Sequence, residues 1–598
     1  PAWSAPSSPF PQVPPPPPAP GRGFQSLSAT APDGRRVALF RAGNVVITGG
    51  AGGDIQVTTE GSPGPRGVRF GNASWVYGEE LDQTTAMWWS PDGRFLAYYR
   101  FDDREVVEVP MLTGVETVRP SVVMLPFPKA GESNPIAQLE VFDTEQNRRI
   151  PIEVGDDREQ YIHDIVWTPD SRFLLFNRMG RHQNRLEVMV ADPRTGESRP
   201  LIVETQETWQ HHRPERTFLS DGRRFLWVSE RSGHRQFELW DVDAGLVRTL
   251  TDGVSPVQAI VRLDEAPGVL WCPAMASETR LNPQLMQVSL DGSAPRRLTP
   301  GDRHYGSFTI APDGRWFTAV EQFVDLAPEF VLFSAEAPEV APRVLREREE
   351  NPWGARGLRA PEFFTCLAAD GETVLYGVLH KPSNFDPSKK YPLLMDVYAG
   401  PGVQTVNSRA ATPDPRSELG MLIAKVDNRG TPGRGKAFEG ATYLRLGGPD
   451  IDDQAAAARC LAERPYVDGS RIAITGHSYG GYATIMALLR YPEVFSVGVA
   501  GAAVTDWRQY DTIYTERYMR TPKENAEGYD AGSAVRRAPR LRGRLMLIHG
   551  MVDDNVHVTN LFEFAHALQR ANRPFDMMIF PTADHGVRGP AVEGVKWS

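Results

Sequence analysis

A short turn-and-strand pattern recurs along the first half of this 598-residue chain. Each copy reads Pro-Asp-Gly-Arg, or a close variant, and runs into an apolar stretch; the copies span residues 31–39, 90–98, 168–176, 219–227 and 311–317. Pro presets the first turn angle and Gly accepts a positive φ, so each copy reverses the chain into a strand. Repetition of strand-rich units about every 40 to 50 residues is typical of β-propeller blades.

The spacing between copies carries further information. The aspartates at 221 and 313 are 92 residues apart, which is two units of 46, and a weaker copy near residues 268–271 fills the gap. The aspartates at 92 and 170 are 78 residues apart, which is more than one ordinary blade needs. We therefore expect an inserted arm or an extra partial blade in that interval.

The pattern changes near residue 362. Buried strands are expected at 392–398, 420–427, 471–475, 497–502, 544–548 and 576–580, alternating with helices such as 452–463. This alternation favours a mostly parallel sheet with helices on both faces. With a chain too long for one core, the predicted organisation is a Pro-rich tail or linker over 1–24, a β-propeller over 25–361 and an α/β-hydrolase, a doubly wound sheet, over 362–598.

Residues 475–483 read Thr-Gly-His-Ser-Tyr-Gly-Gly-Tyr-Ala. The strand expected before them and the helix expected at 482–490 place Ser478 at a strand-to-helix turn. This is the setting of a nucleophile elbow, in which glycines flank the serine because the sharp turn leaves no room for side chains. A bare Gly-x-Ser-x-Gly pattern arises often by chance, so the flanking strand and helix carry the argument.

An elbow serine needs a base, and in this architecture an acid and then a histidine follow it. Asp553 lies just past the strand at 544–548, and His585 lies just past the strand at 576–580. Since parallel strands end at one edge of a sheet, all three side chains are expected at that edge. Either the acid or the histidine alone would favour an ordinary loop residue; the ordered set predicts a catalytic triad.

Composition excludes several other classes. The formal charge of −10 argues against a nucleic-acid binder, and no apolar run approaches the length of a membrane span. Cys272, Cys366 and Cys460 are too far apart for a disulfide framework or a cysteine metal site. We expect no metal and no cofactor. The sequence leaves the compartment open between periplasmic, secreted and cytoplasmic.

A propeller ahead of an α/β-hydrolase resembles the prolyl oligopeptidase family of serine peptidases, and the motifs resemble its dipeptidyl peptidase IV branch. The resemblance runs from about residue 26 to His585. The stretches that carry it are residues 74–80, 87–92, 126–131 with 134–135, 396–401, 427–430, 507–518 and 553–557.

This resemblance implies a role for each matching position. Ser478 is expected to be the nucleophile, His585 the general base and Asp553 the group that orients the histidine. The Tyr398 hydroxyl and the Tyr479 backbone N–H are expected to form the oxyanion hole. Asn555 matches the amide that holds the substrate backbone; the wall for a proline ring matches Tyr479, Val504, Trp507, Tyr510, Tyr514 and Val556.

Glu79 and Glu80 give the most specific expectation. Two adjacent acids on their own favour a solvated turn. The resemblance instead places them where the family holds the free α-ammonium group of a peptide substrate. Anchoring that cation two residues from the cleaved bond implies an exopeptidase that releases dipeptides from free N-termini, with Pro or Ala preferred in second place.

Two alternatives stay open: a tripeptidyl or acylaminoacyl peptidase on the same scaffold, and a propeller interaction protein with an inactive hydrolase. The chain also departs from the branch. His477 stands where Trp is usual, Gly78 replaces an acid, and the arginine that helps hold the substrate carbonyl has no counterpart. The resemblance further implies a propeller incomplete at its start and a hydrolase without its closing helix, which weighs against the family's homodimer.

Overall fold

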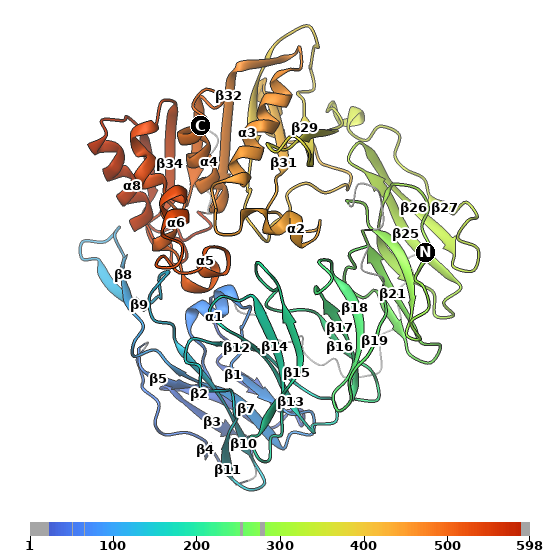
Figure 1. Cartoon of the computed structure of the whole chain (residues 1–598), viewed down its shortest axis with the longest axis vertical. Helices are drawn as coiled ribbons and strands as arrows, with labels where there is room; N and C mark the ends of the chain where they lie inside the picture. The colour runs from blue at the N-terminus through green and yellow to red at the C-terminus, as the bar shows by residue number, and fades with distance from the viewer. Residues whose placement is uncertain (1–22, 51, 65, 252–254, 276–280, 588–598) are drawn as a thin grey trace, which may run out of the picture.

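The structure is a computed structural model that describes residues 23–50, 52–64, 66–251, 255–275 and 281–587. Successive small antiparallel sheets make up the first part, and one eight-stranded sheet with helices makes up the second. Figure 1 shows the small sheets following one another in an arc, from blue to yellow-green, with the orange and red α/β part beside them. The predicted fold class, a propeller followed by an α/β-hydrolase, is confirmed.

Within the described residues the propeller part has six blades, and strands follow sequence order in five of them. Blade one has β1 Ser28–Thr30, β2 Val37–Arg41, β3 Asn44–Thr48 and β4 Ile55–Gln56. Blade two has β5 Val68–Phe70, β6 Met87–Trp89, β7 Phe95–Asp102, β10 Ile136–Asp143 and β11 Arg148–Pro151. Blade three has β12 Tyr161–Trp167, β13 Leu174–Met179, β14 Arg185–Ala191 and β15 Ser198–Thr205.

The remaining blades repeat this plan. Blade four has β16 Arg216–Phe218, β17 Arg224–Ser229, β18 Gln236–Asp241 and β19 Gly245–Thr249. Blade five has β20 Arg262–Asp264, β21 Val269–Ala274, β22 Gln284–Ser289 and β23 Arg296–Arg297, and it contains the weak sequence copy near residue 268. Blade six has β24 His304–Ile310, β25 Trp316–Phe323, β26 Leu326–Ser334 and β27 Arg343–Arg346.

The recurring Pro-Asp-Gly-Arg turn has one physical cause in every copy. The aspartate side chain accepts the backbone N–H of the residue two positions on, at 2.8 to 3.1 Å, and so closes a local turn. The acids are Asp33, Asp92, Asp170, Asp221 and Asp313. Each turn leads directly into an inner strand of its blade, which is why the motif marks the blades in the sequence.

The long spacing between Asp92 and Asp170 contains the expected insertion. It is a two-stranded hairpin of β8 Glu108–Thr113 and β9 Ser121–Pro126, placed between β7 and β10 of blade two. Its pairing is antiparallel, with Glu108 opposite Pro126. The predicted arm is therefore present and separate from the blade sheet.

The eight-stranded sheet has the order β28-β29-β31-β30-β32-β33-β34-β35. Its strands are β28 Glu362–Leu367, β29 Val374–His380, β30 Tyr391–Asp396, β31 Leu422–Asp427, β32 Val467–His477, β33 Val497–Gly501, β34 Arg544–Gly550 and β35 Asp576–Phe580. From β31 to β35 all pairs are parallel. The strands β28 and β29 add an antiparallel edge that the apolar runs did not indicate.

The helices of this part are α2 Lys436–Glu439, α3 Pro449–Ala462, α4 Tyr479–Arg490, α5 Thr512–Met519, α6 Ala526–Gly532, α7 Ala534–Arg537 and α8 Thr559–Arg570. One further helix, α1 Trp75–Glu80, belongs to blade two. The helix α4 starts at Tyr479, three residues before the expected start, because the turn at Ser478 leads straight into it. None of the described helices is long and apolar enough to cross a bilayer.

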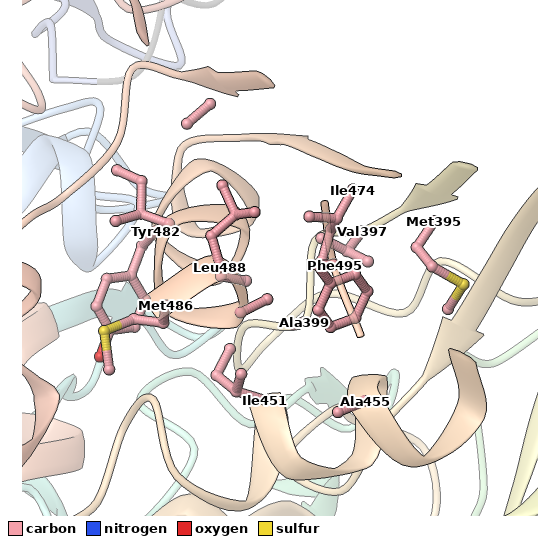
Figure 2. Packing of buried hydrophobic residues seen from close by; sticks show 14 of the residues in the cluster. Met395, Val397, Ala399, Ile451, Ala455, Ile474, Tyr482, Met486, Leu488 and Phe495 are labelled. Atoms are coloured by element: carbon pink, nitrogen blue, oxygen red, sulfur yellow. The ribbon is translucent and has the colours of Figure 1, made fainter. Parts of the chain in front are cut away.

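The largest core lies in the α/β part, where α3 and α4 pack beside the sheet (Figure 2). Figure 2 shows Ile451 and Ala455 of α3 near Met486 and Leu488 of α4, with Phe495 on the sheet side. Leu488 and Phe495 are fully buried. This packing fixes α4, and with it the turn at Ser478, against the parallel strands.

Replacing Phe495 by Ala should lower the free energy of unfolding by about 3 to 5 kcal/mol, since a fully buried ring leaves a cavity. Urea unfolding of the α/β part measures the change. The control is Val497→Ala, a valine that is 39% exposed, with an expected cost below about 1 kcal/mol. Equal unfolding midpoints for the two variants would contradict the packing described.

Candidate active site

Ser478 occupies a strained turn between β32 and α4. Its φ is 60° and its ψ is −120°, a conformation that few residues other than glycine adopt. Its N–H donates to the Gly501 carbonyl of the neighbouring strand at 2.9 Å. A Cβ at Gly476 or Gly480 would lie 2.4 or 2.3 Å from the Val397 carbonyl oxygen, so only glycine fits there. This is the nucleophile elbow that the sequence predicts.

The next two strands supply the other two residues of the predicted triad. Asp553 follows β34 and His585 follows β35, and because the two strands are parallel neighbours both loops lie at one sheet edge. His585 Nδ1 lies 2.8 Å from Asp553 Oδ2. The other carboxylate oxygen, Oδ1, accepts the N–H groups of Asn555 at 3.0 Å and Val556 at 2.9 Å. The acid is thus held by the loop that carries it.

The electrostatics of this pair suit a general base. Burial would raise the pKa of Asp553, but hydrogen bonds from His549 and His585 outweigh it and hold that pKa at about 2. Burial would lower the pKa of His585, but the hydrogen bond to Asp553 and the negative charge of Asp553 outweigh it and raise that pKa above its ordinary value. Asp553 therefore stays ionised, and its charge favours the protonated form of His585, as the predicted role of the pair requires.

His477, a departure from the expected branch pattern, contacts the triad. Its Nε2 lies 2.7 Å from the backbone carbonyl of His585, and the two rings are 5.1 Å apart. A carbonyl only accepts, so Nε2 is the donor. The residue ties the loop of His585 to the end of β32.

Ser478 and His585 line a cavity of about 500 Å³. Nine other residues that the sequence predicts for the site line the same cavity: Glu79, Glu80, Tyr398, Tyr479, Val504, Trp507, Tyr510, Tyr514 and Asn555. Phe24, Asp554, Asp584 and Gly586 also line it, and the sequence did not single them out. Asp553 and Val556 do not line it: both are 1% exposed, and Val556 belongs to the core.

The two expected oxyanion donors lie on the cavity wall. Tyr479 is the first residue of α4, so its N–H has no acceptor within the helix. The Tyr479 hydroxyl donates to Asp450 at 2.8 Å, which leaves only the backbone N–H for a ligand. The Tyr398 ring lies 6.1 Å from the Tyr479 ring. The pair can serve a developing oxyanion beside Ser478.

Three aromatic rings form an apolar corner of the cavity. Trp507 and Tyr514 stack at 5.9 Å, and Tyr510 stands edge-on to Tyr514 at 5.3 Å. Val504, which is 2% exposed, lies beside them. Aromatic faces and edges at these distances form an apolar recess of the kind that suits a small apolar ring.

Glu79 and Glu80 end the helix α1 and are 5% and 6% exposed. Asn555 Nδ2 donates to Glu79 Oε1 at 2.6 Å. The Tyr510 hydroxyl lies 2.7 Å from Asn555 Oδ1 and 3.4 Å from Glu80 Oε1. Thus the loop of the triad acid touches the acids of the propeller directly. They are not the solvated turn that two adjacent acids alone would suggest.

The acids are held against the α/β part through α5, which contacts α1. Arg517 of α5 donates to the backbone carbonyl of Glu80 at 3.2 Å and to Gln183 Oε1 at 2.8 Å. Arg181 of the propeller binds both carboxylate oxygens of Glu516. The sequence did not single out these residues, because nothing local in the sequence marks a contact more than 300 residues distant.

Asp511 adds a third acid behind the pair. It is fully buried and caps α5 by accepting the Tyr514 N–H at 2.9 Å. Burial, and then the charge of Glu80, raise the pKa of Asp511 well above its ordinary value. Burial thus favours the neutral form of Asp511, and the part of the shift that comes from Glu80 shows a negative charge at the end of α1, which favours a bound cation.

The absence of an acid at position 78 has a steric reason. A Cβ on Gly78 would lie 3.0 Å from the carbonyl carbon of Gly23 and 2.9 Å from Gln25 Nε2. The segment around Gly23 crosses α1 at this point and brings Phe24 to the cavity. Most of the Pro-rich tail predicted over 1–24, namely residues 1–22, lies outside the described residues.

A second cavity of about 520 Å³ adjoins the first and shares Glu79, Glu80, Tyr398 and Tyr514 with it. Its far wall holds Lys436, which lies 2.8 Å from Glu230 and 3.5 Å from Glu439. The site therefore lies between the two domains. In the part of the chain that the structure describes, no group of three His, Cys, Asp or Glu side chains is arranged to hold a metal ion.

Two regions of the chain match known protein families. Residues 10–326 match the dipeptidyl peptidase IV (DPP IV) N-terminal region, and residues 408–598 match the prolyl oligopeptidase family. The chain belongs to the prolyl oligopeptidase family, in its dipeptidyl peptidase IV branch. The resemblance that the sequence motifs indicated is confirmed.

Curated members of the family are similar over most of this chain. A probable dipeptidyl-aminopeptidase B of Aspergillus terreus is 32% identical over 611 residues, covering 94% of this chain and 65% of the relative. Its counterpart in Aspergillus clavatus is 30% identical and covers 94% and 66%. The chain thus spans about two thirds of the length of these relatives.

Solved structures of the family share the fold. The crystal structure of Porphyromonas gingivalis dipeptidyl peptidase 4 has a TM-score of 0.84 and 31% identity, covering 95% of this chain and 81% of the other. A putative dipeptidyl aminopeptidase IV from Bacteroides ovatus has a TM-score of 0.82 and 27% identity, covering 96% and 83%.

The raised pKa of His585 predicts how the reactivity of Ser478 depends on pH. A fluorophosphonate should label Ser478 only while His585 is neutral, so the rate should fall as pH drops and reach half its maximum above pH 6.5, the ordinary pKa of histidine. Stopped labelling reactions between pH 5 and 9 measure this, and Ser478→Ala is the unlabelled control. A midpoint below 6.5 would contradict the geometry of the pair.

Proposed function

We propose that this chain is a serine exopeptidase that releases dipeptides from free peptide N-termini, with Pro or Ala preferred as the second residue. One observation carries the proposal: Glu79 and Glu80 line the same cavity as Ser478 and His585, and Asn555 links Glu79 to the loop of the triad acid. The names of the similar proteins, dipeptidyl-aminopeptidase B and dipeptidyl peptidase 4, support it.

Recognition begins at the substrate's amino end. The α-ammonium carries a charge that two largely buried carboxylates can balance, and charge-assisted hydrogen bonds are among the strongest polar contacts. Two residues of extended peptide span at most about 7 Å, so the proposal requires the ammonium group and the cleaved carbonyl to lie about that far apart within the cavity that Glu79, Glu80 and Ser478 line. An internal peptide segment brings no cation, and would leave both acids buried and uncompensated.

The second residue enters the corner formed by Trp507, Tyr510 and Tyr514. A proline ring is flat and compact and brings no N–H, so this apolar wall can cover it without leaving a buried donor unpaired. Alanine is small enough to enter the same space. Larger side chains would need the rings to move, which a close-packed wall resists.

The chemistry then follows from the triad. His585 removes the proton of Ser478 as the hydroxyl attacks the carbonyl carbon, and Asp553 stabilises the resulting imidazolium. The Tyr398 hydroxyl and the Tyr479 N–H stabilise the oxyanion, a contribution of about 3 kcal/mol for each donor. His585 gives its proton to the leaving amine, and water hydrolyses the dipeptidyl ester on Ser478 by the same steps in reverse order.

The alternatives make different demands on this site. An acylaminoacyl peptidase would accept a blocked amine, and a tripeptidyl peptidase would release a product one residue longer. An inactive interaction protein would not be labelled at Ser478. The proposed substrate is a peptide with a free N-terminus; a homodimer like that of the family remains a prediction.

A Gly-Pro-anilide substrate should be cleaved at least about 100-fold faster, in kcat/KM, than its N-acetylated form, because acylation removes the cation that the acids bind. Mass analysis of the products of an unblocked peptide with Pro in second place should show the dipeptide. Equal rates for the free and acetylated forms would rule out recognition of the amine, even though a serine hydrolase would remain.

Replacing Glu79 or Glu80 by Gln should reduce kcat/KM for Gly-Pro-anilide by about 100-fold while leaving the rate of fluorophosphonate labelling within about threefold. Glu116→Gln, on the exposed turn of the β8–β9 hairpin, is the matched control and should change neither. Activity should also fall above about pH 8 as the substrate amine loses its proton. Unchanged kinetics in both site variants would refute the assigned role of the acids.

A further inference from the structure

A histidine outside the triad also contacts the triad acid. His549 is the second-to-last residue of β34 and is 1% exposed. Its Nε2 lies 2.7 Å from the backbone carbonyl oxygen of Val556 and 3.3 Å from Asp553 Oδ2. The first contact is a full hydrogen bond and the second is a longer branch to the carboxylate.

The donor and its proton can be assigned from these partners. A carbonyl oxygen and an ionised carboxylate oxygen only accept, so the Nε2 of His549 must carry the hydrogen. One N–H group therefore faces both ends of the four-residue loop that starts at Asp553 and ends at Val556. The same loop closes on itself through the two N–H groups that Asp553 Oδ1 accepts.

We propose that His549 is a positioning residue for the reaction. It fixes the loop 553–556, and through that loop it sets both the acid that orients His585 and the amide of Asn555 that touches Glu79. This inference rests on the proposed triad but not on the proposed dipeptide product. The strand that carries His549, β34, is itself held by pairing with β33 and β35, so the side chain of His549 acts from a fixed strand on the loop that follows it.

The position of His549 predicts in which direction its removal should shift the pH at which His585 becomes a neutral base. His549 and His585 address the same oxygen, Asp553 Oδ2, at 3.3 and 2.8 Å. A donor on that oxygen withdraws part of its charge from the His585 imidazolium. If the donor is removed, the carboxylate stabilises the imidazolium more strongly, and His585 then needs a higher pH to become a neutral base.

The loop also offers a matched control. His557 is buried, at 3% exposure, and lies four residues beyond Asp553, as His549 lies four residues before it. Neither ring nitrogen of His557 has a hydrogen-bond partner among the described residues, and its ring packs edge-on against Phe127 at 4.4 Å. Replacing it disturbs packing near the triad without removing a donor from the acid.

The test compares four variants by the pH dependence of fluorophosphonate labelling at Ser478. His549→Phe keeps an aromatic ring and removes the donor. His549→Gln places an amide N–H near the Nε2 position, whereas His549→Asn is too short to do so. His557→Phe is the control. Labelling does not depend on which peptide the enzyme cleaves, so the result is independent of the dipeptidase assignment.

We expect His549→Phe and His549→Asn to lower the maximal labelling rate by about tenfold, since a loosely held triad loses orientation, and to raise the pH midpoint by about half a unit. His549→Gln should stay within about threefold of the wild type at an unchanged midpoint. His557→Phe should keep the wild-type midpoint. Thermal melting checks that each variant is folded.

Two results would overturn the proposal. One is a wild-type rate and midpoint in folded His549→Phe or His549→Asn. The other is an equal loss in His549→Gln and His549→Asn with no change in midpoint, which would indicate a purely structural role. If His549→Phe does not fold, the comparison of Gln with Asn decides alone. Absence of labelling in the wild type would overturn the triad and this role together.

Discussion

The contact between α1 and α5 is the constraint on which the site depends. The acids of α1 and the serine of the elbow come from different domains, and Arg517 joins them by donating to the Glu80 carbonyl and to Gln183. Arg181 and Glu516 form an ion pair beside it, in which Glu516 is fully buried. Breaking a buried pair of this kind typically costs about 3 to 5 kcal/mol, so the pair resists separation of the propeller from α5.

Much of the fold could be predicted from local patterns. The Asp33-type turns mark the blades because each aspartate caps its own turn, and the glycines around Ser478 mark the elbow because a Cβ would meet the Val397 carbonyl. Both signals are local in sequence. The edge strands β28 and β29 escaped prediction because no helix separates them from each other or from β30, so they fall outside the strand–helix alternation that indicated the sheet.

The residues of the site could be predicted from the sequence less completely than the fold. The order of Ser478, Asp553 and His585 follows from the sheet topology, and the roles of Glu79 and Glu80 come from family resemblance. Val556 was assigned to the proline wall, but it is buried in the core behind the cavity. Arg517, Gln183 and His549 act through partners that only the folded chain brings near; the single hint for His549 was a histidine at a strand end before the acid loop.

The loop 553–556 has a consequence for how such an enzyme can change over time. Within four residues it carries the acid that pairs with His585 and the amide that contacts Glu79, the residue that we propose binds the substrate amine. The same loop is therefore expected to affect both the rate of reaction and the choice of substrate. A lineage that shifts this loop to admit a new peptide alters its speed in the same step, so diversification is easier through the apolar corner, where side chains can change while the relay stays in place.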